Sequence, residues 1–355
     1  MRKLFICMCE MDAVSYLPNG MNTELFNDPL YEHSFRKIMD CANKIGIDVK
    51  FVRASSCGLH GTVNEYSAEM DDIIAFTSPL LFLAKGKDIE SALEQVIKNE
   101  DSYVTLGNQR NMYMAVGQGR LIAGSSIGSC SEFVTAVSSN GFIAEHVAIA
   151  DGEKCAPPTK LEYLRRVERY REEFIDYLVM SGVEIQARDG IVIGPTCEIH
   201  KGVKILPNTQ IYAWSKVYEN SEIGPNTTIT ATEVGEFCQI SGATVNGCTI
   251  DDNVQIFPGA YIADCQLGDG CVIGSGVVTV NMEGKKKQMC KIGKTTVVGA
   301  NTCLVAPLTI GEGALIACGS TITDDVPTGA LAIAREYQSN HEGFAKRRGK
   351  NGKHI

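Results

Sequence analysis

The sequence has no run of about 18 apolar residues, the length a helix needs to cross a bilayer, so no membrane span is expected. It also lacks an excess of positive charge: 33 lysines and arginines stand against 42 aspartates and glutamates, a formal net charge of −9. Binding to nucleic acid or to an anionic membrane surface needs a positive face, and this balance argues against both. The one short basic run, at residues 346–350, is interpreted as a solvated tail.

Cysteines spaced in pairs, as in a zinc site, are missing as well. The 14 cysteines show no zinc-type spacing, and Cys7 and Cys9 make a lone C-x-C pair, so no metal site is predicted. Free thiols in this number are typical of a reducing compartment, which predicts a cytoplasmic protein. Glycine-rich phosphate loops of the dinucleotide or Walker type are absent. The apolar start is too short for a signal peptide and runs into Glu10, so we expect a buried strand at 3–8.

What the sequence does have is an aliphatic residue at every sixth position through much of its C-terminal half, often followed by glycine. Between two unbroken runs the period continues with slips, through Ile250, Ile256 and Ile262 and then Leu267 and Ile273. The unbroken runs are Ile193, Ile199, Ile205, Ile211, Val217, Ile223 and Ile229, and then Ile292, Val298, Leu304, Ile310, Ile316 and Ile322.

A six-residue period matches neither an α-helix nor an amphipathic strand, and it is typical of hexapeptide repeats. Each hexapeptide is a short strand and a turn, and three of them close one triangular coil. The aliphatic residue points inward, so stacked coils bury a continuous apolar column. At roughly 18 residues per coil, the region from Ile193 to Ala330 predicts about eight coils. Residues 279–291 break the rhythm and are expected to leave the coil as an insertion.

Upstream of the repeats, apolar residues between Pro158 and Ser181 lie on one helical stripe, which predicts a connector helix. Alternating strand-like and helical segments before it predict an α/β layer domain. The expected strands are 3–8, 48–52, 72–76 and 142–150, and the expected helices are 31–44 and 88–99.

Residues 298–311, which read Val-Gly-Ala-Asn-Thr-Cys-Leu-Val-Ala-Pro-Leu-Thr-Ile-Gly, resemble the bifunctional bacterial N-acetylglucosamine-1-phosphate uridyltransferase/glucosamine-1-phosphate acetyltransferase family. So do residues 316–323 and 330–335, and the His-Glu-Gly-Phe of 341–344 resembles that family's ending. The resemblance covers about residues 160–345 and extends faintly into the first half at 27–33 and 77–81.

The resemblance implies that the β-helix is left-handed and that the protein is a cytoplasmic homotrimer using acetyl-CoA. The expected divisions are a degenerate nucleotidyltransferase-like α/β domain at 1–155, a connector at 156–190, a left-handed parallel β-helix at 191–335 and a tail at 336–355.

The first half departs from the family where uridyl transfer would occur. The region 8–25 has no glycine-rich loop for the nucleotide phosphates, and no lysine stands near Gly20. The position of the family's magnesium-binding aspartate is Thr77 or Ser78. The loop's hydrogen-bond donors, the metal-binding carboxylate and the lysine would together stabilise charge that develops on the phosphoryl group. Because all three are missing, we expect uridyltransferase activity to be lost.

In the second half, the resemblance implies that Tyr261, Asn281 and Lys287 hold the amino-sugar phosphate. It implies that Ala300, Cys318 and Arg335 hold acetyl-CoA. Four of these positions have a simpler alternative: Tyr261 as a packing residue between subunits, Asn281 as a turn former, the lysines around Lys287 as a solvated loop tip, and Arg335 as a surface arginine.

The general base is not identified, because the family's catalytic histidine falls on Pro258. His200, the one histidine within the repeats, is interpreted as a surface residue, and Asp264, Asp269 and Glu283 are substitutes for a base. The first hypothesis is an acetyl-CoA-dependent N-acetyltransferase acting on glucosamine-1-phosphate or a related amino-sugar phosphate, in UDP-N-acetylglucosamine synthesis. A different acceptor amine is a second hypothesis, and a non-catalytic trimeric scaffold or sensor of sugar phosphate or CoA is a third.

Overall fold

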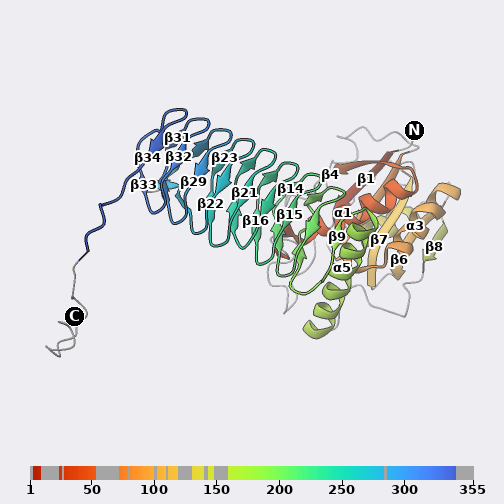
Figure 1. Ribbon diagram of the computed structural model, residues 1–355. Coiled ribbons are helices and arrows are strands. Elements are labelled where there is room, and N and C mark those ends of the chain that lie inside the picture. The colour runs from red at the N-terminus through yellow and green to blue at the C-terminus, as the bar shows by residue number, and fades with distance from the viewer. Residues whose placement is uncertain are drawn as a thin grey trace, which may run out of the picture. The chain divides into compact units, whose positions relative to one another are not determined.

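The computed structural model of the chain describes residues 3–8, 24–25, 28–52, 72–78, 80–99, 102–108, 111–118, 130–139, 143–147, 159–283 and 286–340. The chain divides into two compact units, Met1–Glu233 and Val234–Ile355, which are treated separately. Figure 1 shows an α/β domain followed by a stack of coils. The tail segment 341–344, the basic run 346–350 and residues 9–23 of the expected phosphate-loop region lie outside the described residues.

The α/β domain is built on a six-stranded mixed sheet of order β4-β1-β5-β7-β6-β8. β1 is parallel to β4 and β5, β7 is antiparallel to β5 and β6, and β8 is parallel to β6. The strands are β1 (Lys3–Met8), β4 (Asp48–Val52), β5 (Ile73–Thr77), β6 (Ser102–Asn108), β7 (Asn111–Gln118) and β8 (Ile143–Val147), with a small hairpin of β2 (Glu24–Leu25) and β3 (Asp28–Pro29). The helices are α1 (Leu30–Lys44), the 3-10 turn η2 (Leu81–Leu83), α3 (Gly86–Lys98), α4 (Cys130–Ser139) and α5 (Lys160–Met180).

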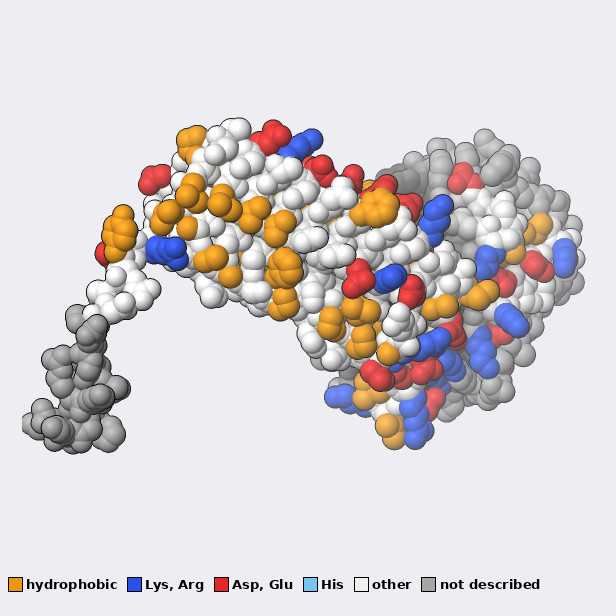
Figure 2. Space-filling view, in the orientation of Figure 1, with side chains coloured by type: hydrophobic (Ala, Val, Ile, Leu, Met, Phe, Trp, Pro, Cys, Tyr) orange, Lys and Arg blue, Asp and Glu red, His pale blue; other side chains and the backbone are white. Residues whose placement is uncertain are grey.

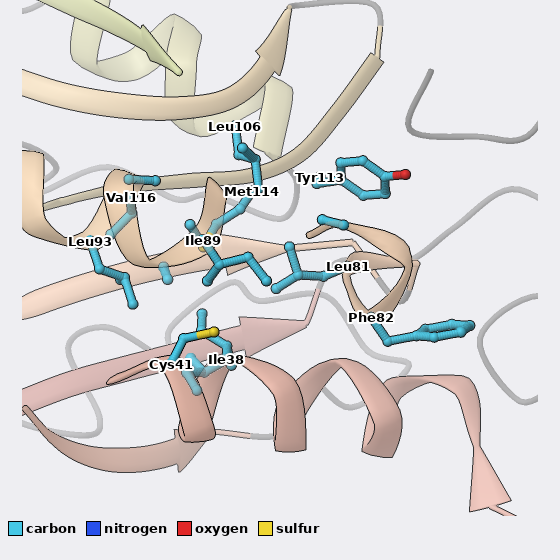
Figure 3. Packing of buried hydrophobic residues seen from close by; sticks show 14 of the residues in the cluster. Ile38, Cys41, Leu81, Phe82, Ile89, Leu93, Leu106, Tyr113, Met114 and Val116 are labelled. Carbon is cyan, nitrogen blue, oxygen red and sulfur yellow. The ribbon is translucent and has the colours of Figure 1, made fainter. Parts of the chain in front are cut away.

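The predicted α/β class is confirmed, and the six predicted elements of this domain occur within two or three residues of their expected bounds. The hairpin of β6 and β7 and the helix α4 were not predicted. The core gathers apolar side chains from α1, η2, α3 and the sheet, and Figure 3 shows Ile38, Leu81, Ile89 and Met114 converging in it. Burial of this apolar surface stabilises the domain.

The connector helix α5 is confirmed, and its ends follow capping rules. The Thr159 hydroxyl accepts from the backbone N–H of Glu162 at 3.2 Å, which caps the N-terminus. The buried Arg166 guanidinium donates to the Tyr113 hydroxyl at 3.1 Å and to Glu162 at 3.2 Å, which ties α5 to the sheet. Arg171 donates to the carbonyl of Ile191 at 3.0 Å, which ties the same helix to the first coil. A buried charge that is hydrogen-bonded in this way fixes a helix in place.

The C-terminal region is a parallel β-solenoid of about eight turns, as the hexapeptide period predicts. Three sheets of eight, seven and nine strands form its faces, and each coil contributes one strand to each sheet. The eight-stranded sheet contains β10 (Val192–Ile193), β13 (Gln210–Tyr212), β16 (Thr228–Thr230), β19 (Thr244–Asn246), β22 (Tyr261–Ala263), β25 (Val278–Val280), β30 (Cys303–Val305) and β33 (Thr321–Ile322). The seven-stranded sheet contains β11 (Glu198–Ile199), β14 (Lys216–Val217), β17 (Glu233–Val234), β20 (Thr249–Ile250), β23 (Cys265–Leu267), β28 (Cys290–Ile292) and β31 (Leu308–Ile310). The nine-stranded sheet contains β9 (Glu184–Ile185), β12 (Lys204–Ile205), β15 (Glu222–Ile223), β18 (Gln239–Ile240), β21 (Gln255–Ile256), β24 (Val272–Ile273), β29 (Val297–Val298), β32 (Leu315–Ile316) and β34 (Leu331–Ala332).

The aliphatic column points inward as predicted. Ile211, Val298 and Ile316 are at most 1% exposed, and each stacks in register on the equivalent residue of the next coil. Ile199 is half-buried, because β11 lies at the end of its sheet and is covered by a neighbouring strand on one side alone. The left-handed winding of the coils stays a prediction.

The turns at the corners need unusual backbone angles. Asn208, Asn226 and Asn301 all have φ between 54° and 57°, which asparagine adopts more readily than most residues. The Asn208 side-chain amide donates to the Asn226 side-chain oxygen in the next coil at 3.1 Å. At Gly276 a Cβ would lie 2.4 Å from the Asn301 side-chain oxygen, so the corner stack also requires a missing side chain.

Candidate functional site

The insertion predicted at 279–291 is an antiparallel hairpin that leaves the coil between β25 and β28. Its strands are β26 (Met282–Glu283) and β27 (Lys286–Lys287). The backbone N–H of Gln288 donates to the Asn281 carbonyl at 2.8 Å and closes the base of the hairpin. The hairpin therefore projects Lys287 from a fixed root on the solenoid.

Asp264 lies at the centre of the cluster that this hairpin forms. Its Oδ2 accepts a hydrogen bond from Asn281 Nδ2 at 2.5 Å, and its Oδ1 lies 3.6 Å from Lys287 Nζ. Asp264 follows β22 at a corner where its φ is +49°. The Asp264 backbone N–H donates to the Asn246 carbonyl, and the Asp264 backbone carbonyl accepts from the N–H of Cys290. These two hydrogen bonds fix the Asp264 backbone from both sides.

The solenoid has three edges, and this cluster occupies one of them. Asp264 and Asn281 both lie at the corner between the eight- and seven-stranded sheets, and we call this corner the Lys287 edge. Tyr261, at the start of β22, is 42% exposed and pairs in register with Val278 on the neighbouring strand. Tyr261 is thus on the strand that leads to the edge, but at its opposite end.

Ala300, Cys318 and Arg335 lie together on a second edge, between the nine- and eight-stranded sheets, which we name the Arg335 edge. The Ala300 carbonyl accepts from the backbone N–H of Gly319 at 2.9 Å, and the Cys318 carbonyl accepts from the Arg335 guanidinium at 3.1 Å. A Cβ on Gly299 would lie 2.6 Å from the Cys318 backbone nitrogen, so the coils pack closely here. Cys318 is a free, exposed cysteine on this edge.

Pro258 also lies on the Arg335 edge, in the turn between β21 and β22. Its carbonyl accepts from the backbone N–H of Gly276 in the next coil at 3.1 Å. Its side chain carries no proton-accepting group. The position that the resemblance gives to a histidine therefore shapes this edge without supplying a base.

Within one chain, the two groups of predicted site residues are separated by the width of the eight-stranded sheet. The Lys287 edge holds Asp264, Asn281 and Lys287, whereas the Arg335 edge holds Ala300, Cys318 and Arg335. The sequence prediction gave the sugar phosphate to Tyr261, Asn281 and Lys287 and acetyl-CoA to the second group. It named Asp264 as a substitute base and not as the partner of Asn281 and Lys287. The signal for Asp264 was available in the repeat, since an aspartate directly after a strand sits at a left-handed corner.

His200 and the other two acidic candidates, Asp269 and Glu283, do not join the Asp264 cluster among the described side chains. His200 lies in the first unit, 3.3 Å from the Glu219 carboxylate and against the Tyr218 ring. Asp269 lies at the third edge, between the seven- and nine-stranded sheets, and accepts from the Asn253 amide at 3.0 Å. The side chain of Glu283 lies outside the described residues.

At the end of β5, where a magnesium-binding aspartate was sought, Thr77 is fully buried and the Ser78 hydroxyl accepts from the backbone N–H of Leu80 at 3.2 Å. In the described part of the chain, no group of three or more His, Cys, Asp or Glu side chains could hold a metal ion. The described helices also include none that is both long and apolar enough to span a bilayer.

Two of the three outer faces carry exposed apolar side chains that stack in register. On the nine-stranded sheet, Val272, Val297, Leu315 and Leu331 pair one after another on neighbouring strands, and the last three are 38–58% exposed. On the eight-stranded sheet Tyr261 pairs with Val278, and on the seven-stranded sheet the equivalent positions are Gln266, Lys291 and Thr309. Figure 2 shows hydrophobic side chains gathered over the later coils. Apolar surface of this extent is typical of an interaction face.

Comparison with known proteins confirms the resemblance. A family described as bacterial transferase hexapeptide (six repeats) matches residues 247–281, which include Asp264 and Asn281. The chain is 35% identical over 226 residues to the bifunctional protein GlmU of Thermoanaerobacter pseudethanolicus, covering 54% of this chain and 50% of that protein. It is 42% identical over 195 residues to the same-named protein of Campylobacter concisus, covering 49% of this chain and 43% of that protein. The chain thus spans about half the length of the curated relatives it matches.

Among solved structures, the UDP-N-acetylglucosamine acyltransferase from Campylobacter jejuni is 22% identical, with a TM-score of 0.33 over 43% of this chain and 69% of that chain.

Proposed function

We propose that this chain is an acetyl-CoA-dependent N-acetyltransferase of the hexapeptide-repeat class, acting on glucosamine-1-phosphate or a related amino-sugar phosphate in UDP-N-acetylglucosamine synthesis. The observation that carries the proposal is the Asp264–Asn281–Lys287 cluster, rooted on a solenoid whose repeats match transferase hexapeptides. The similarity to GlmU proteins supports the substrate class.

In this proposal the Lys287 edge binds the acceptor. Lys287 is 68% exposed, so its ammonium is available to a phosphate, and the amide of Asn281 is oriented by Asp264. The Arg335 edge binds the donor: Arg335 pairs with a CoA phosphate, and backbone groups near Ala300 and Cys318 lie along the pantetheine. The neutral acceptor amine attacks the thioester carbonyl and forms the C–N bond, the C–S bond breaks, and the proton that the nitrogen loses is taken up by the departing CoA thiolate.

The proposed working unit is a homotrimer, because one chain does not bring its two edges together. If two chains meet through the apolar outer faces, the Lys287 edge of one can lie beside the Arg335 edge of the next. Cyclic symmetry repeats that contact and closes the assembly. A site shared in this way takes Lys287 from one copy and Arg335 from the next. It therefore exists in the assembly and not in the isolated chain.

The test is release of free CoA thiol from acetyl-CoA in the presence of glucosamine-1-phosphate, with glucosamine and glucose-1-phosphate as acceptors lacking the phosphate or the amine. The proposal requires turnover with glucosamine-1-phosphate, its loss in Lys287→Ala, and none with glucose-1-phosphate. Turnover with another amine alone would support a related acyltransferase with a different acceptor.

Pro258 favours a second candidate function, a non-catalytic sensor of sugar phosphate or CoA, because loss of a positioned base costs about 10²–10⁴-fold in rate. The same samples decide between the two. Calorimetric binding of glucosamine-1-phosphate or CoA without any thiol release would favour the sensor, and no binding of either would favour a scaffold. Loss of uridyl transfer is proposed on the absence of a carboxylate at Thr77 and Ser78, and a UTP-dependent pyrophosphate-release assay tests it.

A further inference from the structure

A separate cavity of about 140 Å³ opens in the first unit between α1, the start of α3 and α5. It shares no residue with the Lys287 or Arg335 edges, and the proposed acetyl transfer gives it no role. A cavity of about 150 Å³ is large enough to hold one benzene ring. Its size therefore suits a ligand with a single six-membered ring.

One wall of this cavity is aromatic. Tyr170, Phe174 and Tyr177 recur at helical spacing on one face of α5. The rings of Phe174 and Tyr177 lie nearly parallel, at 17°, with their centroids 6.2 Å apart. Tyr177 is 45% exposed, so this wall reaches the solvent. A planar ring entering the cavity would find aromatic surface to pack against.

Cys41 and Gly86 form a part of the lining with little bulk, next to the charged side chains of α1 and Glu173 of α5. The buried Cys41 thiol points at the carbonyl of Gly86, 3.6 Å away, at the first residue of α3. A Cβ built on Gly86 would lie 3.8 Å from Cys41 Sγ, an ordinary contact distance. The space beside Cys41 can therefore be reduced by one methyl group without a clash.

Two of the three cations that line the cavity already have close partners. Lys37 donates to the Phe82 carbonyl at 2.9 Å and to Glu173 at 3.0 Å, and Lys44 pairs with Glu90 at 3.0 Å. Arg36 is different: its Nε is buried and makes no hydrogen bond to any atom of the described residues. The same Nε lies 3.5 Å from Asp40 Oδ1 as an ion pair, and 25% of the Arg36 side chain is exposed. That separation is longer than a normal N–H···O hydrogen bond, so a ligand carboxylate at closer range would give this buried Nε its acceptor.

We propose that this cavity binds a small aromatic carboxylate, with the ring between the α5 aromatic wall and Cys41 and the carboxylate accepting from Arg36. Such a ligand would contact both α1 and α5. Because Arg171 joins α5 to the first coil, occupancy would stabilise the unit that contains the domain, the helix and the first coils.

The probe is benzoate, titrated into the full-length protein by ligand-observed NMR and calorimetry. Benzylamine, with the same ring and opposite charge, and acetate, with the charge and no ring, are the matched comparisons. We expect benzoate to bind in the millimolar range or tighter and at least about tenfold more tightly than either comparison. Equal binding of benzoate and benzylamine, or no binding of benzoate at millimolar concentration, would overturn the proposal.

Variants localise the site. Arg36→Met should weaken benzoate binding by about tenfold, whereas Arg165→Met, on the exposed surface of α5, should leave it unchanged. Gly86→Ala should weaken binding by filling the cavity, and because the new methyl meets no clash, its melting temperature should stay close to that of the parent. Benzoate affinity that is the same in Arg36→Met, Gly86→Ala and the parent would place the ligand elsewhere and overturn the proposal.

Discussion

The Asp264 carboxylate accepts a 2.5 Å hydrogen bond from the Asn281 amide and thereby joins the corner of one coil to the root of the hairpin. The carboxylate also faces Lys287, so one half-buried corner residue sets the position of two proposed acceptor-binding groups. This arrangement makes Asp264 a positioning residue, because its oxygens are already engaged by its neighbours. The proposed acceptor site can be tested through it.

Asp264→Asn should raise the KM for glucosamine-1-phosphate by about tenfold and change kcat less, because a charge-assisted hydrogen bond contributes about 1.5–3 kcal/mol and the new amide NH₂ repels Lys287. The measurement is steady-state thiol release.

Asp269→Asn is the matched control for this variant, since Asp269 is also a corner aspartate that accepts an asparagine amide, on the third edge. Its KM should match that of the parent. Equal effects of the two substitutions would show that a generic corner defect, and not the position of Asn281 and Lys287, changes the kinetics.

Mixed assemblies should recover activity that neither parent variant has. Lys287→Ala and Arg335→Ala alter different edges, so a contact between one chain of each kind can contain one intact shared site. In a cyclic trimer, every mixed assembly of the two variants contains one intact site out of three, so co-expressed, doubly tagged and purified mixtures should approach about one third of the parent rate. No recovery in verified mixed trimers would place each site within a single chain.

Val298→Ala and Val297→Ala test the inward column with the same substitution at adjacent residues. Val298 is 1% exposed and Val297 is 38% exposed. Removal of two buried methyl-sized groups should lower the free energy of unfolding by about 1–3 kcal/mol for Val298→Ala, and by less than about 0.5 kcal/mol for Val297→Ala. Urea unfolding monitored by circular dichroism measures both, and similar losses would contradict the assignment of inward and outward positions.

Thiol reactivity should separate Cys318 from Cys41. Burial raises the pKa of the Cys41 thiol to about 12, so at pH 8 only about one molecule in 10⁴ carries the reactive thiolate there. Cys318 is exposed on the Arg335 edge. Brief iodoacetamide treatment followed by peptide mass mapping should label Cys318 and spare Cys41, and CoA should slow the labelling of Cys318. Labelling of Cys318 at the same rate with and without CoA would count against the donor assignment.

The solenoid could be predicted from the sequence because its information is local and repeated: each inward aliphatic residue occupies the same environment one coil further along. An insertion at 279–291 was predicted for the same reason, because residues that break the period cannot continue the coil; the structure narrows it, since 279–280 and 290–291 belong to the coil strands β25 and β28. The hairpin of β6 and β7 was missed because buried strands in a mixed sheet do not alternate, as the fully buried Tyr113–Val116 stretch shows.

The candidate site was harder to predict because it depends on which edge a residue occupies. Residue type and family resemblance brought Lys287 and Arg335 into one list, but the assignment of turns to edges requires the strand order of all three sheets. The central place of Asp264 follows from side-chain contacts between coils, which the one-in-six pattern does not encode.

The coils can change length without losing the inward column. One route is a shorter or longer corner turn, because coils of 16, 17 and 18 residues place Ile240 on Ile256, Val245 on Ile262 and Ile211 on Ile229, each pair in register. The hairpin between β25 and β28 shows the other route, because extra residues that begin and end at the same corner leave the register on both sides intact. New specificity in this scaffold is therefore expected to arise at corners, where the chain can lengthen without disturbing the prism.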